Sequence, residues 1–139
     1  MNVLITGSSG FLGKEVVKVL EKKKYNLTFL GRKKIKKKNY IFYNLNNLKK
    51  LKNVLDKNNP NVIINLAAEV NFNKNTKDMY AVNSFCPYEI AKFCKKKNVH
   101  FIHASGTIVN GIKKKYSRKT KLNPINHYGK SKLKGDNLI

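Results

Sequence analysis

The sequence predicts an α/β fold: a doubly wound parallel sheet with helices on both faces and strand order 3-2-1-4-5. Three observations predict it. Short apolar segments alternate with segments of helical periodicity, a glycine-rich turn joins the first strand to the first helix, and no repeat or linker interrupts the 139 residues. Buried parallel strands are continuous apolar runs, and right-handed crossovers between them give this winding. The length suits a single domain.

The first half of the chain contains three predicted strands. Residues 3–6 are a short apolar run, residues 27–30 form the second strand, and residues 40–43 form the third, beyond a basic loop over 31–39. Between the first two strands, apolar residues recur at helical spacing and are expected to share one buried face. These residues are Leu12, Val16, Val19 and Leu20.

The second half continues the alternation. A helix is predicted to end before Asn59-Pro60, and the apolar run 62–66 is the fourth strand. A further helix precedes the fifth strand, residues 99–104, and a loop over 106–124 leads to a last helix from about Asn126. The apolar positions that predict the two middle helices are Leu48, Leu51, Val54 and Leu55, then Met79, Val82, Cys86, Ile90 and Phe93.

The chain is strongly basic, with 30 Lys and Arg against 7 Asp and Glu and a net charge of +23. A basic chain attracts polyanions, so a nucleic-acid-binding protein is an alternative. Many of the lysines close helices, however, where cations suit the helix dipole. No zinc finger, RNA-recognition motif or helix-turn-helix pattern is present. We therefore expect a solvated basic surface and no specific nucleic-acid partner.

No signal-peptide pattern or membrane-spanning apolar run is present, so we expect a cytoplasmic protein without a membrane partner. Cys86 and Cys94 lie eight apart on one predicted helix, too far for an unstrained disulfide, and are expected to be buried thiols. The three histidines form no metal pattern, and no metal site is expected. His100 and His103 are expected at a strand edge or satisfied in the core, and His127 at the surface.

Residues 6–13, Thr-Gly-Ser-Ser-Gly-Phe-Leu-Gly, follow the first strand and open the first helix. Gly7 permits the tight turn, Gly10 lets backbone approach a pyrophosphate, and Gly13 lets helix and strand pack closely. The helix N-terminus adds free N–H groups and partial positive charge. Because the strand before and the helix after are both predicted, the turn indicates a dinucleotide-binding site.

The end of the second strand bears on the choice of dinucleotide. An acidic residue there would bind the ribose 2′-hydroxyl and favour NAD, but this chain has Arg32-Lys33 instead. Arg32 can meet a 2′-phosphate bidentately and stack on the adenine, with Lys33 as a second charge. The same residues can simply begin the basic loop that continues to Lys38. We expect NADP(H), with NAD as the alternative.

A second constellation lies near the C-terminal end. Ser105 follows the fifth strand at the ligand-binding edge of the sheet, where it can hydrogen-bond a substrate oxygen. Tyr128 and Lys132 are four apart on one helix face. A lysine cation close to a tyrosine favours the phenolate and draws its pKa down towards neutrality. Glu69, after the fourth strand, either contacts substrate or is solvated in a loop.

In their order and spacing, these residues resemble the NAD(P)-dependent epimerase/dehydratase group, the extended short-chain dehydrogenases/reductases. The resemblance covers essentially all 139 residues, and its last two motifs are most similar to dTDP-4-dehydrorhamnose reductase-like members. The motifs are Thr6-Gly7-x-x-Gly10-Phe11-Leu12-Gly13, Pro60 to Ala68, Tyr80-Ala81-Val82-Asn83, Ala104 to Gly111, and Tyr128 to Asp136.

The resemblance implies a Rossmann-like domain over 1–139 and an NADP(H)-dependent oxidoreductase or epimerase-type enzyme acting on a nucleotide-linked sugar or related carbonyl compound. Tyr128 would be the general acid/base, Lys132 would bind the nicotinamide ribose, and Ser105 would orient the substrate oxygen. Asn83 would hold a relay water. The implied cofactor-binding positions are Gly7, Ser9, Gly10, Phe11, Leu12, Gly13, Arg32, Lys33, Asn44, Leu45, Leu66, Ala67, Ala68, Asn83, Tyr128 and Lys132.

Three departures from the family pattern keep alternatives open. Asn44 stands where the family usually has an acidic residue near the adenine, and Ala104 replaces one of two hydroxyl residues, leaving Ser105 alone. Family members are about twice as long, so the fold is expected to stop before the substrate-binding part. The alternative functions are a non-catalytic NADP(H)-binding fragment that needs a partner for its second half and a basic nucleic-acid-binding protein. The expected protein partner is either a complementing chain or further copies of this chain in a homo-oligomer.

Overall fold

The computed structural model describes residues 1–33, 35, 38–70, 76–112, 116–117 and 119–139. It contains a five-stranded parallel sheet of order β3-β2-β1-β4-β5, which confirms the predicted order. The elements are β1 (Asn2–Thr6), α1 (Phe11–Glu21), β2 (Asn26–Gly31), β3 (Tyr40–Phe42), α2 (Leu48–Asn58), β4 (Val62–Asn65), α3 (Thr76–Tyr80), the π-helical η1 (Ala81–Phe85), α4 (Cys86–Lys97), β5 (His100–His103), the 3₁₀-helical η2 (Thr107–Asn110) and α5 (His127–Leu138).

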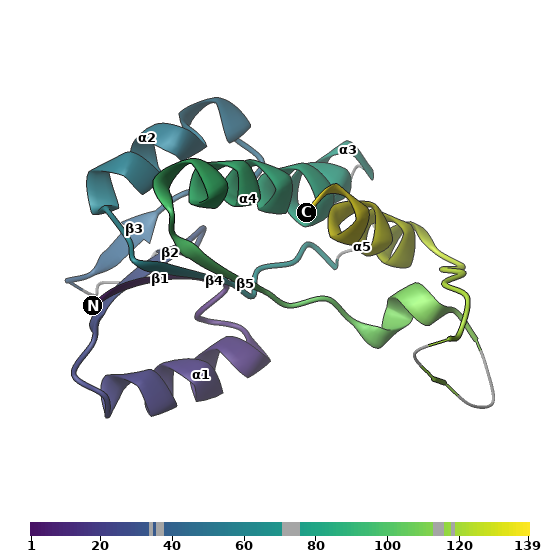
Figure 1. The fold of residues 1–139 in the computed structure, drawn as a ribbon, viewed down its shortest axis with the longest axis horizontal. Coiled ribbons are helices and arrows are strands. Elements are labelled where there is room, and N and C mark those ends of the chain that lie inside the picture. The colour runs from purple at the N-terminus through teal and green to yellow at the C-terminus, as the bar shows by residue number, and fades with distance from the viewer. Residues whose placement is uncertain (34, 36–37, 71–75, 113–115, 118) are drawn as a thin grey trace.

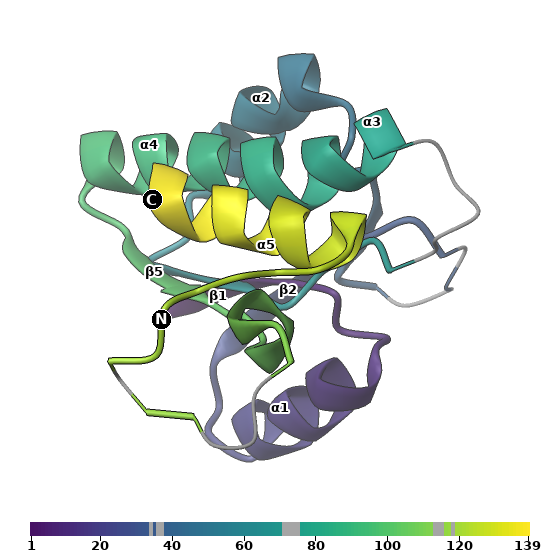
Figure 2. The ribbon, with the colours of Figure 1, turned by 90° about the vertical axis from the view of Figure 1, so that its right-hand side faces the viewer.

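The helices divide unequally between the two faces of the sheet. Figure 1 shows α1 on one face and α2, α4 and α5 on the other. On the second face α5 packs against η1 and α4, beside which it lies in Figure 2. Successive residues of β1 therefore serve two cores: Leu4 belongs to the cluster under α2 and α4, whereas Val3 and Ile5 belong to the cluster under α1.

The predicted buried face of α1 is wrong in two of its four residues. Leu12 and Val19 are 52% and 58% exposed, whereas Val16 and Leu20 pack against the Val3 and Ile5 cluster as expected. The reason is the close approach of the helix to the glycine turn at Gly13, the one buried residue of α1. Because of this contact, the stripe of α1 that faces the sheet contains Gly13, Val16 and Leu20, each one turn from the next. Leu12 and Val19 lie beside this stripe.

Truncation of Val19 tests this corrected orientation of α1. Val19→Ala is expected to change the free energy of unfolding by no more than about 0.5 kcal/mol, because the side chain is exposed. Leu20→Ala, the matched control one residue on, is expected to lose about 1–2 kcal/mol of packing against the sheet. Urea denaturation of both variants measures the difference, and equal losses would restore the original prediction.

The second half of the chain differs from the prediction in detail. The segment predicted as one helix is α3, η1 and α4 in succession, and η2 lies within the predicted loop 106–124. Both cysteines are buried free thiols, as expected, and burial raises the pKa of Cys86 to about 12. In the described part of the chain, no helix has the length and apolar character needed to cross a bilayer.

Candidate functional site

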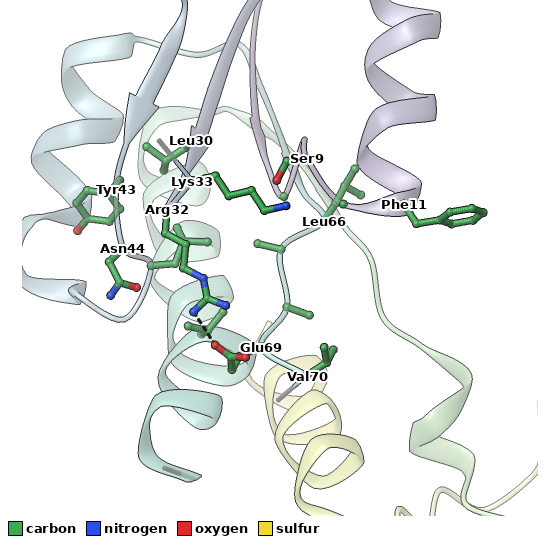
Figure 3. A pocket seen from close by; sticks show the side chains of 17 residues that line it. Ser9, Phe11, Leu30, Arg32, Lys33, Tyr43, Asn44, Leu66, Glu69 and Val70 are labelled. Atoms are coloured by element: carbon green, nitrogen blue, oxygen red, sulfur yellow. Dashed lines mark hydrogen bonds and ion pairs between the residues drawn. The ribbon is translucent and has the colours of Figure 1, made fainter. Parts of the chain in front are cut away.

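A cavity of about 500 Å³ opens where β1, β2 and β4 end, the edge at which open parallel sheets bind ligands. Figure 3 shows the cavity framed by the glycine turn on one side and the end of β2 on the other. Its lining residues are Gly7, Ser9, Gly10, Phe11, Leu30, Gly31, Arg32, Lys33, Tyr43, Asn44, Leu45, Leu66, Ala67, Ala68, Glu69, Val70 and Val82.

The glycine turn is a backbone cradle that side chains would fill. Gly7 has a φ of +72°, and a Cβ there would lie 2.6 Å from the Ala67 nitrogen. A Cβ on Gly13 would overlap the Gly7 carbonyl oxygen. The Gly10 N–H donates to that same oxygen over 3.0 Å, which closes the turn. The predicted roles of Gly7 and Gly13 in turning and packing are therefore consistent with the geometry.

The cradle fits an anionic group such as a pyrophosphate. Gly10 is the N-cap of α1 and contributes no side-chain cap, and the first turn of α1 contains no acidic residue. The first N–H groups of a helix have no intrahelical partner, and they carry the positive end of the helix dipole. Since this helix end borders the cavity at Gly10 and Phe11, it offers donors and favourable charge to a phosphate.

Arg32 and Lys33, the two predicted cofactor cations, both line the cavity but point to different places. Figure 3 shows the Arg32 side chain running to Glu69, and the Lys33 side chain pointing towards Ser9 in the glycine turn. Arg32 Nη1 lies 2.7 Å from Glu69 Oε2. Glu69 is only 3% exposed, so the interpretation of this residue as solvated in a loop is wrong.

Five predicted cofactor positions lie outside the residues that line this cavity. Leu12 is exposed and Gly13 is buried behind the turn. Asn83 is buried, and its side-chain amide exchanges two 2.8 Å hydrogen bonds with the Glu69 backbone while donating to Ser131 Oγ over 3.0 Å. Tyr128 and Lys132 lie on α5. The sequence analysis had named Glu69 as a candidate for substrate contact, and it missed five other lining residues: Leu30, Gly31, Tyr43, Val70 and Val82.

The second constellation gathers where β5 meets α5. The Asn126 side chain accepts a 2.8 Å hydrogen bond from the Gly129 N–H and so fixes the start of α5 beside Tyr128. Lys132 is 2% exposed, and its Nζ donates to the Ala104 carbonyl over 2.7 Å. The Ser105 hydroxyl donates to the Asp136 carboxylate. The structure thus joins the ends of β5 and α5 through polar groups.

The pKa shifts at this constellation follow from burial. Burial raises the pKa of the Tyr128 phenol, the direction opposite to that expected from a neighbouring lysine. The Lys132 pKa is lowered, again by burial first, with Asp136 opposing the shift. The Lys132 ammonium is directed to the Ala104 carbonyl and to His103. A neutral phenol at this position holds a proton that it can donate.

A row of side chains connects the ends of β1, β4 and β5. Thr6 Oγ1 donates to Asn65 Oδ1 over 2.5 Å, and Asn65 Nδ2 lies 2.9 Å from His103 Nδ1. With Asn65 donating, the neutral imidazole carries its proton on Nε2, which faces Asp136 Oδ1 at 3.5 Å and Lys132 Nζ at 3.3 Å. Burial, then the Lys132 charge, lowers the pKa of His103 to about 4.

His103 is therefore a mostly buried histidine whose Nδ1 accepts a hydrogen bond from Asn65, close to the core placement that was one of the two expected for it, while its contact with Lys132 was not foreseen. Asp136 was also missed, although it follows Lys132 by four residues on α5 and thus shares its face. Among the described residues, no group of three or more His, Cys, Asp or Glu side chains is placed to hold a metal ion.

Comparison with protein-family models matches residues 1–139 to the family described as RmlD substrate binding domain. Among curated proteins, the chain is similar to a dTDP-4-dehydrorhamnose reductase of Aggregatibacter actinomycetemcomitans. The two are 29% identical over 142 residues, which cover 99% of this chain and 46% of that protein. The chain therefore spans about half the length of the curated relative it matches.

Solved structures give the same picture. A hypothetical dTDP-4-dehydrorhamnose reductase from Sulfolobus tokodaii matches with a TM-score of 0.88 and 30% identity, over 99% of this chain and 51% of that one. The Bordetella bronchiseptica enzyme WbmG, solved in complex with NAD, matches with a TM-score of 0.88 and 19% identity, over 99% of this chain and 48% of that one. At 19% identity the likeness to WbmG establishes the shared fold.

Proposed function

The chain belongs to the RmlD substrate-binding domain family, and we propose that it is the dinucleotide-binding and catalytic part of an NADP(H)-dependent oxidoreductase or epimerase-type enzyme acting on nucleotide-linked sugars. One observation carries the proposal: the glycine cradle, a helix N-terminus and Arg32 border a single cavity at the carboxyl edge of the sheet. The proposed compartment is the cytoplasm, in keeping with two buried free thiols.

In the proposed mode of binding, each group in the cavity has a separate task. The turn over Gly7 and Gly10 and the first turn of α1 receive the pyrophosphate. Lys33, which points towards the turn, adds a positive charge there (Figure 3). Arg32 at the end of β2 meets the 2′-phosphate of NADP(H), because its planar fork of donors matches phosphate oxygens. Ala67 and Ala68 leave room where the cavity continues past β4.

The proposed chemistry is transfer of a hydride, which the nicotinamide cofactor supplies or accepts when bound. Tyr128 exchanges a proton with the substrate oxygen, and its buried phenol, whose pKa is raised, carries the proton that carbonyl reduction consumes. Lys132 holds the ribose after its ammonium releases the Ala104 carbonyl, and it shares a helix face with Tyr128, four residues before it on α5. Ser105 orients the substrate oxygen after releasing its hydrogen bond to Asp136.

Titration of the purified chain with NADPH and, separately, NADH tests this proposal. We expect NADPH to bind with a dissociation constant at least about tenfold lower than that of NADH, the free energy of roughly one charge-assisted hydrogen bond. Tyr128→Phe serves as a folding control and is expected to bind within about threefold of the wild type, because the hydroxyl contributes to proton transfer rather than to the cavity.

The possible outcomes separate the candidate functions. Tighter binding of NADH than of NADPH would remove the assigned role of Arg32, and failure of a folded chain to bind either cofactor would remove the proposal. Binding of NADPH without turnover of any nucleotide-linked sugar would favour the second candidate, a dinucleotide-binding module that does no chemistry by itself.

A further inference from the structure

We propose that Glu69 is a selectivity residue of the dinucleotide cavity, because it holds Arg32 in a bridge that a 2′-phosphate must compete with. The margin by which NADPH is preferred over NADH is then set by the opposed pair Arg32 and Glu69, and not by Arg32 alone. This inference rests on the proposed function, since it assumes that a dinucleotide occupies the cavity.

The bridge spans the cavity between two strand ends. Arg32 follows β2 directly, Glu69 lies four residues beyond β4, and both line the cavity. The 2.7 Å separation of Nη1 and Oε2 is that of a charge-assisted hydrogen bond. In Figure 3 the Arg32 guanidinium extends from the end of β2 to the Glu69 carboxylate. A ligand group that needs the guanidinium at the end of β2 must therefore draw it away from Glu69.

The two partners differ in freedom to move. The Arg32 side chain is 51% exposed and that of Glu69 is 3% exposed. The Glu69 backbone is clamped by the Asn83 amide, which accepts from its N–H and donates to its carbonyl, each over 2.8 Å. Asn83 is itself 1% exposed and donates to Ser131 on α5. Glu69 is thus the fixed partner and Arg32 the movable one.

The competition has a definite sign. A 2′-phosphate needs the Arg32 guanidinium, so its binding breaks the charge-assisted hydrogen bond between Arg32 and the Glu69 carboxylate. A ribose 2′-hydroxyl carries no charge, leaves that bond in place and can donate to a carboxylate. Glu69 therefore acts against NADPH, and Arg32 acts for it. Neutralising Glu69 should raise the preference for the 2′-phosphate by about tenfold, the usual size of one such interaction.

The test uses the adenosine halves of the two cofactors, 2′,5′-ADP and 5′-AMP, whose affinity ratio isolates the 2′-phosphate. We expect Glu69→Gln to raise the ratio about tenfold relative to the wild type. Glu15→Gln is the matched control, because it removes the same charge from an exposed i,i+3 pair with Lys18 on α1. It is expected to leave the ratio within about twofold. Thermal unfolding of each variant establishes that it is folded.

A double-mutant cycle with Arg32→Ala separates the bridge from a general effect of charge. In the Arg32→Ala background we expect the preference for 2′,5′-ADP to be largely lost and Glu69→Gln to change the ratio by less than about twofold. If Glu69→Gln fails to fold, Glu69→Asp replaces it. The shorter side chain weakens the bridge and should shift the ratio in the same direction, by about threefold.

An unchanged or lowered ratio in the Glu69 variants would overturn the inference, and so would an equal rise in both backgrounds. These results leave the proposed function standing, because the wild type still binds NADPH and NADH. Failure of the folded wild type to bind any of the four nucleotides removes the proposed function and the inference with it.

Discussion

Replacing Gly13 with alanine is expected to weaken dinucleotide binding by at least about a hundredfold. The added Cβ overlaps the Gly7 carbonyl oxygen and lies 2.8 Å from Ser8 Cα, and both of these are backbone atoms of the turn. Backbone cannot move aside as a flexible side chain does, so α1 must shift away from the turn that it completes. The variant is also expected to lose about 1–3 kcal/mol of unfolding free energy, the usual cost of overpacking.

Gly106→Ala is the matched control for this substitution. A Cβ on Gly106 meets only Ile108 Cγ2, at 3.8 Å, which is an ordinary contact. Its dinucleotide affinity is expected to stay within about twofold of the wild type. Fluorescence titration with NADPH and urea denaturation measure the two effects. A Gly13→Ala variant that binds within tenfold of the wild type would show that the turn tolerates a displaced helix.

Acidification is expected to destabilise the chain by about 3 kcal/mol through His103 alone, between pH 6.5 and pH 4. In the folded chain, burial and the Lys132 charge lower the pKa of His103 to about 4, whereas the unfolded chain has the ordinary value of 6.5. Between pH 6.5 and pH 4, His103 is therefore protonated in the unfolded state and largely neutral in the folded state. The contribution is fully present above pH 6.5 and is lost as the pH falls towards 4.

Urea denaturation at several pH values, compared with His103→Gln, isolates this contribution from that of the carboxylates. Glutamine keeps a polar side chain of similar length but does not titrate. Between pH 6.5 and pH 4 the free energy of unfolding of the variant should therefore fall by about 3 kcal/mol less than that of the wild type. His127→Gln, at an exposed position, is the matched control and should follow the wild type. Parallel pH profiles for the wild type and His103→Gln would contradict the assignment.

The fold was largely predictable from the sequence because its signals are local. Apolar runs such as residues 62–66 mark strands that are buried on both faces, and among doubly wound sheets with right-handed crossovers 3-2-1-4-5 is the natural order to expect. The face of α1 was predicted wrongly because apolar spacing alone does not say which stripe faces the sheet. Leu12 and Val19 recur at the same helical spacing as Leu20. The contact at Gly13, however, turns the neighbouring stripe of the helix towards the sheet and leaves Leu12 and Val19 exposed.

In the candidate site, too, local features were predictable and contacts between distant residues were not. The glycine turn was predictable because its residues are consecutive and their backbone requirements follow from residue type. The contacts of Glu69 and His103 were not, because their partners Arg32 and Lys132 lie 37 and 29 residues away in the chain. The π-helical turn at η1 likewise has no sequence signal in a helical period of 3.6, although it contains Asn83, which clamps Glu69.

The row formed by Thr6, Asn65 and His103 has an evolutionary consequence. Each side chain meets the hydrogen-bonding needs of the next at the end of a different strand, and Thr6 and Asn65 are at most 1% exposed. Exchanging one member alone for an apolar residue leaves a buried polar group without its partner, which costs about 1–3 kcal/mol. These three positions should therefore covary among relatives: a lineage without the imidazole must change the amide as well.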